Sequence, residues 1–197
     1  MIRRFALMKG DKMEEERKII LRAKKDIKAF NYLYEKYFPR IFNYVNMRVQ
    51  NRDITEEIVS NVFYKAMKKL YLFKFQKIPF SAWLYRISIS EISNYFRKEK
   101  KHSKLNQNLY IEKSIYKSVD MGNTPSYEFI YKYIRMLNIT DQEIITLRYF
   151  DKKSFEEISQ IMNIKENTAR VRLHRSLKKL QSLIPEQEWK NENRRIS

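Results

Sequence analysis

The 197-residue sequence contains no cysteine, and this absence excludes several kinds of site. Without thiols the chain has no disulfide, no thiolate zinc site and no cysteine nucleophile, and the composition fits a reducing cytoplasm. Glycine occurs only twice and proline only four times. Because β-sandwiches and barrels need many turns, such a low content of turn residues favours a fold built from long helices.

Long hydrophobic runs are also absent from the sequence. No segment approaches the roughly 18 consecutive apolar residues of a membrane span. The apolar stretch that follows Arg3 and Arg4 already ends at Lys9, which is too short for the core of a signal peptide. We therefore expect a cytoplasmic protein without a membrane span.

Positive charge dominates the charged residues of the sequence. There are 41 lysines and arginines against 23 acidic residues, a formal net charge of +18. Such an excess favours a polyanionic partner, either nucleic acid or an anionic membrane surface. Hydrophobic residues make up 43% of the chain, which is enough for packed cores.

The first half of the sequence shows helical periodicity. Apolar side chains recur at three- and four-residue steps from Ile27 to Tyr37, and we expect Pro39 to end this helix and begin another. Asp53 or Thr55 is predicted to cap a third helix that ends near Leu70. A loop from Tyr71 to Pro79 and a fourth helix from Phe80 onward are predicted next.

A change of character after Phe96 indicates a domain boundary. A basic run is followed by a polar, weakly periodic stretch that contains Gly122. We predict an all-α fold of two helical domains joined by a linker. The predicted parts are a first domain at 13–102, a linker at 103–124, a second domain at 125–184 and a basic C-terminal tail at 185–197.

The second half of the sequence contains the pattern of a helix-turn-helix. Thr140 with Glu143 and Ser154 with Glu157 have the spacing of capping boxes, which start helices. Asn163 stands at the turn, where a positive φ is needed. A last helix of about Glu166 to Leu183 then buries one stripe, formed by Ala169, Leu173, Leu177 and Leu180.

That buried stripe defines the outward face of the last helix. The face presents Asn167, Arg170, Val171 and His174, with Lys165, Arg172, Arg175 and Lys178 on its flanks. Polar residues near the start of such a helix reach base edges in the major groove, whereas basic residues further along suit phosphates. An ordinary helical hairpin with a solvated basic face is the alternative. Because the chain has only two histidines and no cysteine, we predict no metal site.

Several segments in both halves of the sequence resemble those of bacterial sigma factors. The segment LRYF at Leu147–Phe150, the helix with Glu157-Ile158-Ser159 and the segment from Thr168 to Ser176 are similar to the sigma domain that binds the promoter −35 element. The stretch from Phe30 to Lys101 resembles the sigma domain that binds core RNA polymerase and the −10 element. Two domains in this order are similar to the extracytoplasmic-function (ECF) group.

The resemblance implies three sets of site residues. The implied contacts to core polymerase are Glu56, Glu57, Val59, Ser60 and Phe63. The implied −10 contacts are Lys74, Phe75, Gln76, Arg86, Asn94, Arg97, Lys98 and Lys101. The implied −35 contacts are Lys165, Asn167, Thr168, Arg170, Val171, Arg172, His174 and Arg175. Trp83 and Tyr85 could stack on unpaired bases, although we favour core packing for Trp83.

The resemblance also implies a function and partners. We expect a non-enzymatic sigma factor that binds core RNA polymerase, promoter DNA and an anti-sigma factor, and that uses no cofactor and no small-molecule substrate. One alternative is a two-domain helix-turn-helix transcriptional regulator that acts without being a polymerase subunit. Others are a metal-dependent enzyme acting on nucleic acid, with Glu14 to Glu16 as ligands, and a basic protein of the membrane surface.

Overall fold

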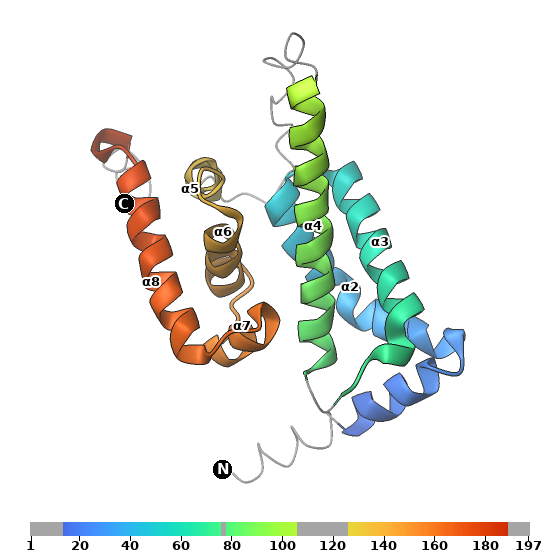
Figure 1. Cartoon of the computed structure of the whole chain (residues 1–197). Coiled ribbons are helices and arrows are strands. Elements are labelled where there is room, and N and C mark those ends of the chain that lie inside the picture. Colours follow the sequence, from blue (N-terminus) through green and yellow to red (C-terminus); the bar gives the residue numbers. More distant parts are fainter. Residues whose placement is uncertain (1–13, 76–77, 106–125, 189–197) are drawn as a thin grey trace.

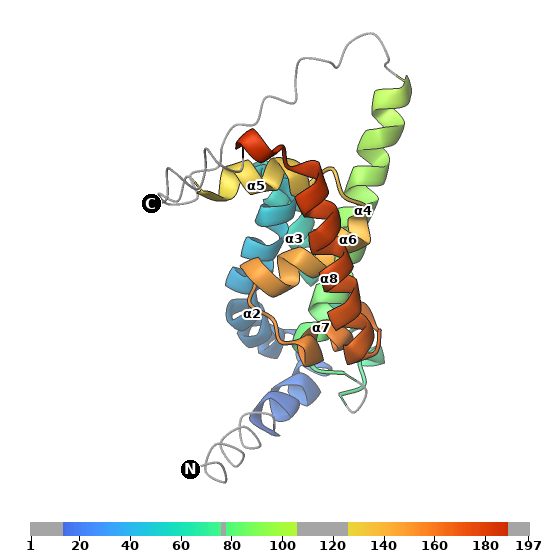
Figure 2. The ribbon, with the colours of Figure 1, turned by 90° about the vertical axis from the view of Figure 1, so that its left-hand side faces the viewer.

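The fold is entirely helical in the residues that the structure describes. The structure is a computed structural model that describes residues 14–75, 78–105 and 126–188 (Figure 1), and no β-strand occurs among them. The prediction of an all-α protein is confirmed. The helices form an N-terminal and a C-terminal half, which lie side by side (Figures 1 and 2).

The N-terminal half is a bundle whose helices contact one another pairwise. Residues 14–23 are helical, and the next elements are α2 (Ile27–Val49), α3 (Arg52–Lys69), the short 3₁₀ turn η1 (Leu70–Leu72) and α4 (Phe80–Leu105). The apolar stripe of α2 is buried between α3 and α4, with Leu33, Ile41 and Tyr44 at most 1% exposed. The three- and four-residue spacing seen in the sequence therefore places this stripe in the core.

Aromatic side chains fill the end of this bundle at which α4 begins. Phe80 is fully buried, and its ring centroid lies 5.4 Å from that of Tyr37 and 5.4 Å from that of Phe73. Trp83 packs on the same cluster, 5.1 Å from Phe73. This placement agrees with the core packing that we favoured for Trp83.

The C-terminal half contains the predicted helix-turn-helix. Its elements are α5 (Ser126–Ile134), α6 (Ile139–Ile145), the π-helical turn η2 (Thr146–Phe150), α7 (Phe155–Met162) and α8 (Glu166–Leu183). Helix α8 packs against both α6 and α7, and Figure 2 shows it crossing in front of α6. The bounds of α8 agree with the predicted last helix.

The predicted break at Pro39 is wrong, because α2 runs through this residue without interruption. Proline removes one backbone N–H and therefore frees the carbonyl of residue 35. Pro39 and Glu35 are both exposed, so water can hydrate this carbonyl. The buried stripe keeps its register on both sides of Pro39, from Leu33 to Ile41, and tertiary packing holds the helix together.

Two other helix starts also differ from the predictions. Asn51, and not Asp53 or Thr55, caps α3, and its side chain accepts a hydrogen bond from the Ile54 N–H at 3.1 Å. Asn138 caps α6, so Thr140 lies inside the helix and the predicted capping box with Glu143 does not form. The capping box of Ser154 with Glu157 is present at the start of α7, as predicted.

The predicted linker is shorter than residues 103–124 at its N-terminal end, because α4 continues to Leu105. Residues 106–125 lie outside the described residues. The buried side chains of both halves form one continuous cluster, so the two predicted domains pack against each other in this structure. The contact between them arises from α2 against η2 and α4 against α7.

Candidate DNA- and polymerase-binding surfaces

The turn between α7 and α8 has the geometry that the sequence predicts. Asn163 ends α7 with φ 55° and ψ 48°, in the left-handed region that asparagine tolerates better than most residues. The Asn163 and Ile164 backbone N–H groups both donate to the Ser159 carbonyl. The freed carbonyl at the end of α7 is thereby satisfied, and the chain reverses within a few residues to begin α8.

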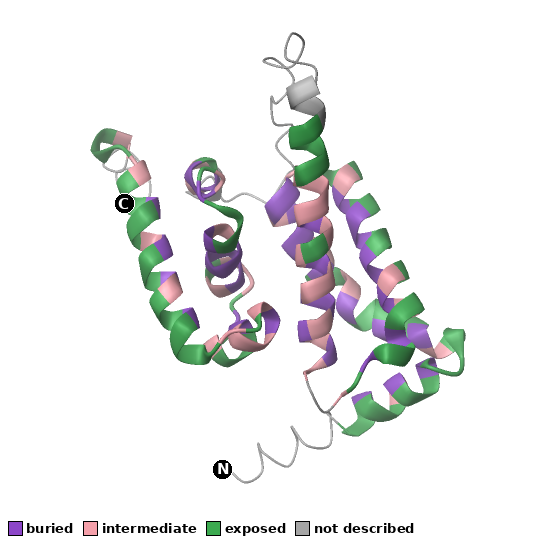
Figure 3. Cartoon of the chain, in the orientation of Figure 1, coloured by how far each residue is buried: buried purple, intermediate pink, exposed green. Residues whose placement is uncertain are grey.

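Helix α8 buries one side, and its opposite side faces solvent (Figure 3). Ala169 is fully buried, and Leu173 and Leu180 are each 6% exposed, whereas Leu177 is half-buried. Ser176 is also fully buried, which the sequence pattern did not predict. Its hydroxyl donates to Asp141 Oδ1 on α6 at 2.6 Å, so a polar contact replaces apolar packing at this position.

Most of the predicted −35 residues lie on the exposed side of α8. The exposed ones are Lys165, Asn167, Thr168, Arg170, Val171, His174 and Arg175. Arg172 is half-buried and lines a crevice of about 480 Å³, whose other walls are formed by α4, α6 and the end of α7. Helix α8 can therefore present a polar and basic surface to a DNA groove, whereas Arg172 faces the other half of the protein.

Arg170 is held in place by two neighbours that the sequence reasoning missed. Its guanidinium carbon lies 4.4 Å from the centroid of the Phe155 ring, and Nη2 is 2.5 Å from Glu166 Oε1. The stacking on Phe155 joins the first helix of the motif to the second. The four-residue spacing of Glu166 and Arg170 on a helix is typical of an ion pair, so the sequence could have predicted this contact. The contact with Phe155 depends on the crossing of α7 and α8 and had no local signal.

Asp141 joins α6 to α8 through a cluster of hydrogen bonds. Besides Ser176, Lys179 Nζ donates to Asp141 Oδ2 at 2.6 Å, and the Asn138 side-chain amide donates to the same oxygen at 2.6 Å. Burial opposes ionisation of this carboxyl, but the hydrogen bonds and the charge of Lys179 outweigh burial and lower its pKa below the ordinary value. The ionised carboxylate thus fixes the position of α8.

We expect this cluster to make the fold sensitive to acid. A carboxyl whose pKa is lowered by folding stabilises the protein above its ordinary pKa, and the stabilisation is lost as the pH falls through the lowered value. Asp141→Asn should therefore reduce the free energy of unfolding by about 1–3 kcal/mol at pH 7, and the difference from the wild type should shrink below about pH 4. Thermal melts of both proteins from pH 7 to pH 3 measure this difference. Asp53→Asn, at an exposed carboxylate, is the matched control, and a difference for Asp141→Asn that is constant with pH would contradict the prediction.

The predicted −10 residues are distributed over α4 and the loop before it. Arg97, Lys98 and Lys101 are exposed near the C-terminal end of α4, and half-buried Asn94 accepts a hydrogen bond from Arg97 at 2.9 Å. Lys74 is exposed, and Phe75 is half-buried with its ring 6.4 Å from that of Phe73. Gln76 lies outside the described residues.

Arg86 is the predicted −10 residue that the structure places elsewhere. Its guanidinium points at the C-terminal end of α7 and donates to the Gln160 carbonyl at 2.6 Å and the Ile161 carbonyl at 3.2 Å. Carbonyls at a helix C-terminus lack partners inside the helix and carry partial negative charge, which favours a cation there. In this arrangement Arg86 contacts the helix-turn-helix and is not available to DNA.

The predicted polymerase-binding residues of α3 fall on two sides of the helix. Glu56, Glu57 and Ser60 are exposed. Val59 and Phe63 are 1% and 3% exposed and pack in the core, so they are not accessible to a partner here. The accessible surface of α3 is thus acidic near its N-terminus, where the helix dipole stabilises negative charge.

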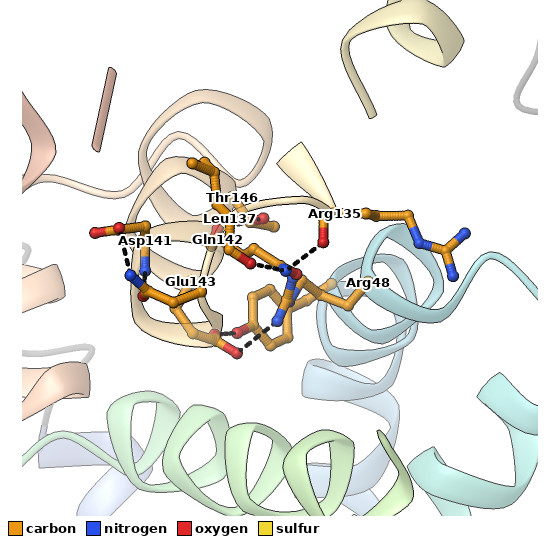
Figure 4. A network of polar contacts seen from close by, with 9 residues as sticks. Arg48, Arg135, Leu137, Asp141, Gln142, Glu143 and Thr146 are labelled. Carbon is orange, nitrogen blue, oxygen red and sulfur yellow. Dashed lines mark hydrogen bonds and ion pairs between the residues drawn. The ribbon is translucent and has the colours of Figure 1, made fainter. Parts of the chain in front are cut away.

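A buried polar network joins the two halves and is drawn in Figure 4. Arg48 on α2 lies 3.1 Å from Glu143 on α6, and each of these side chains is 3% exposed. Tyr44 donates a hydrogen bond to the same carboxylate, and Arg48 also donates to Gln142. Burial and the neighbouring negative charge of Glu143 raise the pKa of Tyr44, so this hydroxyl remains a donor.

The described residues contain neither a helix suited to a membrane nor a cluster suited to a metal ion. None of the helices described is both long and apolar enough to cross a bilayer. No group of three or more histidine, cysteine, aspartate or glutamate side chains is arranged to hold a metal ion within the described part of the chain.

Comparison with family models identifies both halves. Residues 33–102 match the model for Sigma-70 region 2, and residues 129–180 match the model for Sigma-70, region 4. Together the two matches cover more than half of the chain, in the order that the sequence analysis predicted.

Several curated proteins resemble this chain along most of its length. The ECF RNA polymerase sigma factor BldN of Streptomyces coelicolor is 25% identical over 165 residues, which are 80% of this chain and 61% of BldN. The chain thus spans less than two thirds of BldN. The sigma factor YlaC of Bacillus subtilis is 25% identical over 148 residues, 73% of this chain and 85% of YlaC. The ECF sigma-E factor of Escherichia coli is 28% identical over 164 residues, 78% of this chain and 85% of that protein.

Solved structures show the same fold. CnrH, in complex with the cytosolic domain of CnrY, matches with a TM-score of 0.61 at 18% identity, over 85% of this chain and 95% of that one. The sigma factor RpoE from Bartonella quintana, in complex with the anti-sigma factor NepR, matches with a TM-score of 0.60 at 23% identity, over 79% of this chain and 96% of that one. With both regions matched in order, the chain belongs to the sigma-70 family of RNA polymerase sigma factors, in its ECF group.

Proposed function

We propose that this chain binds core RNA polymerase and directs it to promoters by recognising the −10 and −35 elements. The observation that carries the proposal is the joint presence of two regions in one chain: a helix-turn-helix with an exposed polar face on α8, and a region 2 bundle with exposed acids on α3. A regulator that acts without polymerase has no need of the second surface. The sigma-70 family is not an enzyme family, and we propose no catalytic activity. The proposed site of action is the cytoplasm.

We assign −35 recognition to α8 and −10 recognition to α4 and its preceding loop. The exposed face of α8 enters the major groove, where Arg170 is suited to a bidentate contact with guanine. The basic end of α4, with Arg97, Lys98 and Lys101, contacts the phosphate backbone near −10. Residues 13–102 and 125–184 act as two binding units, which polymerase holds at a fixed separation. Two weak sites then combine through effective concentration into one strong site.

An anti-sigma factor is the third proposed partner. The solved structures that resemble this chain include CnrH in complex with the cytosolic domain of CnrY, and the sigma factor RpoE in complex with the anti-sigma factor NepR. We propose that this chain has a protein partner of the same kind, which restricts its access to polymerase until a signal releases it.

Run-off transcription with purified core polymerase tests the main proposal. The chain should confer initiation at its cognate promoters, which a library of genomic fragments from the source organism supplies. A gel shift with duplex DNA in the absence of polymerase distinguishes a sigma factor from a helix-turn-helix regulator. A regulator binds its operator tightly without polymerase, whereas a sigma factor does not. If the chain neither binds core polymerase nor yields a transcript, the proposal is wrong.

The acids at the start of α3 provide a prediction about core binding. Reversing both charges in the Glu56→Lys, Glu57→Lys variant should weaken binding to core polymerase by about tenfold or more. We propose that these acids face a basic surface of polymerase, which the two new lysines would repel. Both side chains are exposed, and the Arg52–Glu56 pair at 3.0 Å lies at the surface, so the fold should tolerate the change.

Fluorescence anisotropy of the labelled chain titrated with core polymerase measures this affinity. Glu14→Lys is the matched control, since Glu14 is also exposed but lies outside α3. Equal affinity of the double variant and the control would show that Glu56 and Glu57 do not contact polymerase.

A further inference from the structure

The ring of Phe155 is in contact with two arginines from two neighbouring elements. The guanidinium carbon of Arg148 lies 4.9 Å from the centroid of this ring, and that of Arg170 lies 4.4 Å from it. Arg148 belongs to η2, Phe155 is the first residue of α7, and Arg170 lies in the second turn of α8 (Figure 1). One aromatic side chain therefore joins the recognition helix to both elements that precede it.

Arg148 is fixed in position but keeps hydrogen-bonding capacity. It is half-buried, and its Nη1 atom donates to the Lys153 carbonyl at 2.9 Å. A guanidinium has five N–H donors. In the part of the chain that the structure describes, the other donors of Arg148 have no hydrogen-bond partner. The ring and the carbonyl thus hold this arginine in one place, and most of its donors can still bind an acceptor outside the chain.

The backbone on either side of this arginine departs from regular structure. The η2 turn is π-helical, and the Asp151 N–H donates to the Thr146 carbonyl at 3.0 Å. Lys152 has φ 53°, in the left-handed region that favours glycine. Both features are rare in proteins and occur preferentially at functional sites. Their presence beside Arg148 indicates that this segment has a function beyond packing.

The charges around Phe155 are only partly balanced. Two cations against one ring repel each other, and Glu166 pairs with Arg170 at 2.5 Å. Arg148 has no ion pair among the described residues. An aliphatic side chain would fill the same space, but only a flat aromatic face attracts cations and orients them. An anion bound to Arg148 would relieve the repulsion, and beside a recognition helix the expected anion is a DNA phosphate.

From these observations we propose that Phe155 is a positioning residue for −35 recognition. Its ring holds Arg170 in the orientation that reads a base. It also holds Arg148, which is a further residue of this surface, in the orientation that binds a neighbouring DNA phosphate. Base reading and backbone binding are thereby kept at one fixed spacing. The proposal deepens the proposed sigma function and rests on it.

Replacing the ring while keeping an apolar side chain tests this role in reconstituted holoenzyme. The measured quantity is the ratio of run-off transcription from a promoter with an intact −35 element to that from the same promoter with an altered one. Phe155→Leu should lower this ratio by about three- to tenfold, because two cation–π contacts are lost. Phe155→Tyr keeps the aromatic face and should keep the wild-type ratio. Phe42→Leu is the matched control, since Phe42 is a half-buried aromatic residue of α2 that packs on Phe38.

The outcomes distinguish positioning from a merely structural role. A structural role would lower transcription from both promoters alike, and an unchanged ratio for Phe155→Leu would overturn the proposal. An equal fall for Phe155→Tyr would overturn it as well. If the wild type itself yields no transcript that depends on the −35 element, the proposed sigma function is wrong instead.

A double-mutant cycle separates positioning from a direct contact of Phe155 with DNA. Because the ring acts on base reading through Arg170, Phe155→Leu should lower the ratio in the wild type but not further in an Arg170→Ala background. A further loss of the same size in that background would show that Phe155 itself touches DNA, and the positioning role would be wrong.

The role of Arg148 is measured by the salt dependence of promoter binding. In Arg148→Gln holoenzyme, the slope of log affinity against log salt should decrease in magnitude by about 1, because one phosphate contact is lost. Lys132→Gln removes an exposed lysine of α5 in the same half of the protein and should leave the slope unchanged. A wild-type slope for Arg148→Gln would show that this arginine binds no phosphate and would overturn the proposed clamp.

Discussion

Arg170→Ala is expected to reduce transcription from promoters with an intact −35 element by about 10- to 100-fold, since a bidentate arginine contributes about 1–3 kcal/mol of base discrimination. Arg170 is exposed on α8, and its stacking on Phe155 and its ion pair with Glu166 hold the guanidinium in one place before DNA arrives. A contact that is organised in advance costs less conformational entropy when it binds. Run-off transcription with reconstituted holoenzyme measures the loss.

The controls for Arg170→Ala separate DNA recognition from polymerase binding. Lys178→Ala removes another exposed basic residue of α8, nearer its C-terminal end, and should cost much less transcription. Arg172→Ala should also weaken −35 recognition, by a smaller factor than Arg170→Ala because Arg172 is half-buried beside α4. Core binding should be unchanged in all three variants. Loss of core binding by Arg170→Ala would show that the two regions have been assigned to the wrong partners.

Phe80→Ala is expected to cause the largest loss of stability, about 3–5 kcal/mol in the free energy of unfolding. Phe80 is fully buried at the first turn of α4, where its ring packs between those of Tyr37 and Phe73. Replacing it with alanine removes the buried ring and leaves a cavity that the surrounding helices fill only in part. The loss should also loosen the loop before α4, because Phe73 belongs to that segment.

Urea denaturation followed by circular dichroism measures this change as a shift of the transition midpoint. The matched control is Phe75→Ala, because Phe75 is half-buried at the edge of the same cluster and should cost only about 1 kcal/mol. A loss of less than about 1 kcal/mol for Phe80→Ala would mean that the aromatic cluster does not support the bundle.

The features that sequence reasoning predicted well are local ones. The capping box of Ser154 with Glu157, the left-handed turn at Asn163 and the extent of α8 each depend on residues a few positions apart. Because short-range hydrogen bonds and sterics decide such features, the same residues produce them in most surroundings. The exposed face of α8 followed from its buried stripe, since one determines the other.

The failed predictions were also local, and tertiary contacts overrode them. Pro39 should end a helix by its own chemistry, but the packing of Leu33 and Ile41 on either side maintains α2. Thr140 and Glu143 have the spacing of a capping box, but Glu143 is instead used by Arg48 and Tyr44. Val59 and Phe63, the implied polymerase contacts of α3, are buried in this structure, and their binding role stays a prediction.

The sequence by itself determined the helical fold, the two regions in their order and the solvent-facing side of the recognition helix, because periodicity and capping act between neighbours along the chain. Only the tertiary structure decided that Arg86 binds the end of α7 and that Arg48 pairs with Glu143, 95 residues away. Periodicity says which side of a helix is buried, but it does not say which segment covers it. That choice depends on the packing of the whole chain, and in this protein it joins the two regions through charges.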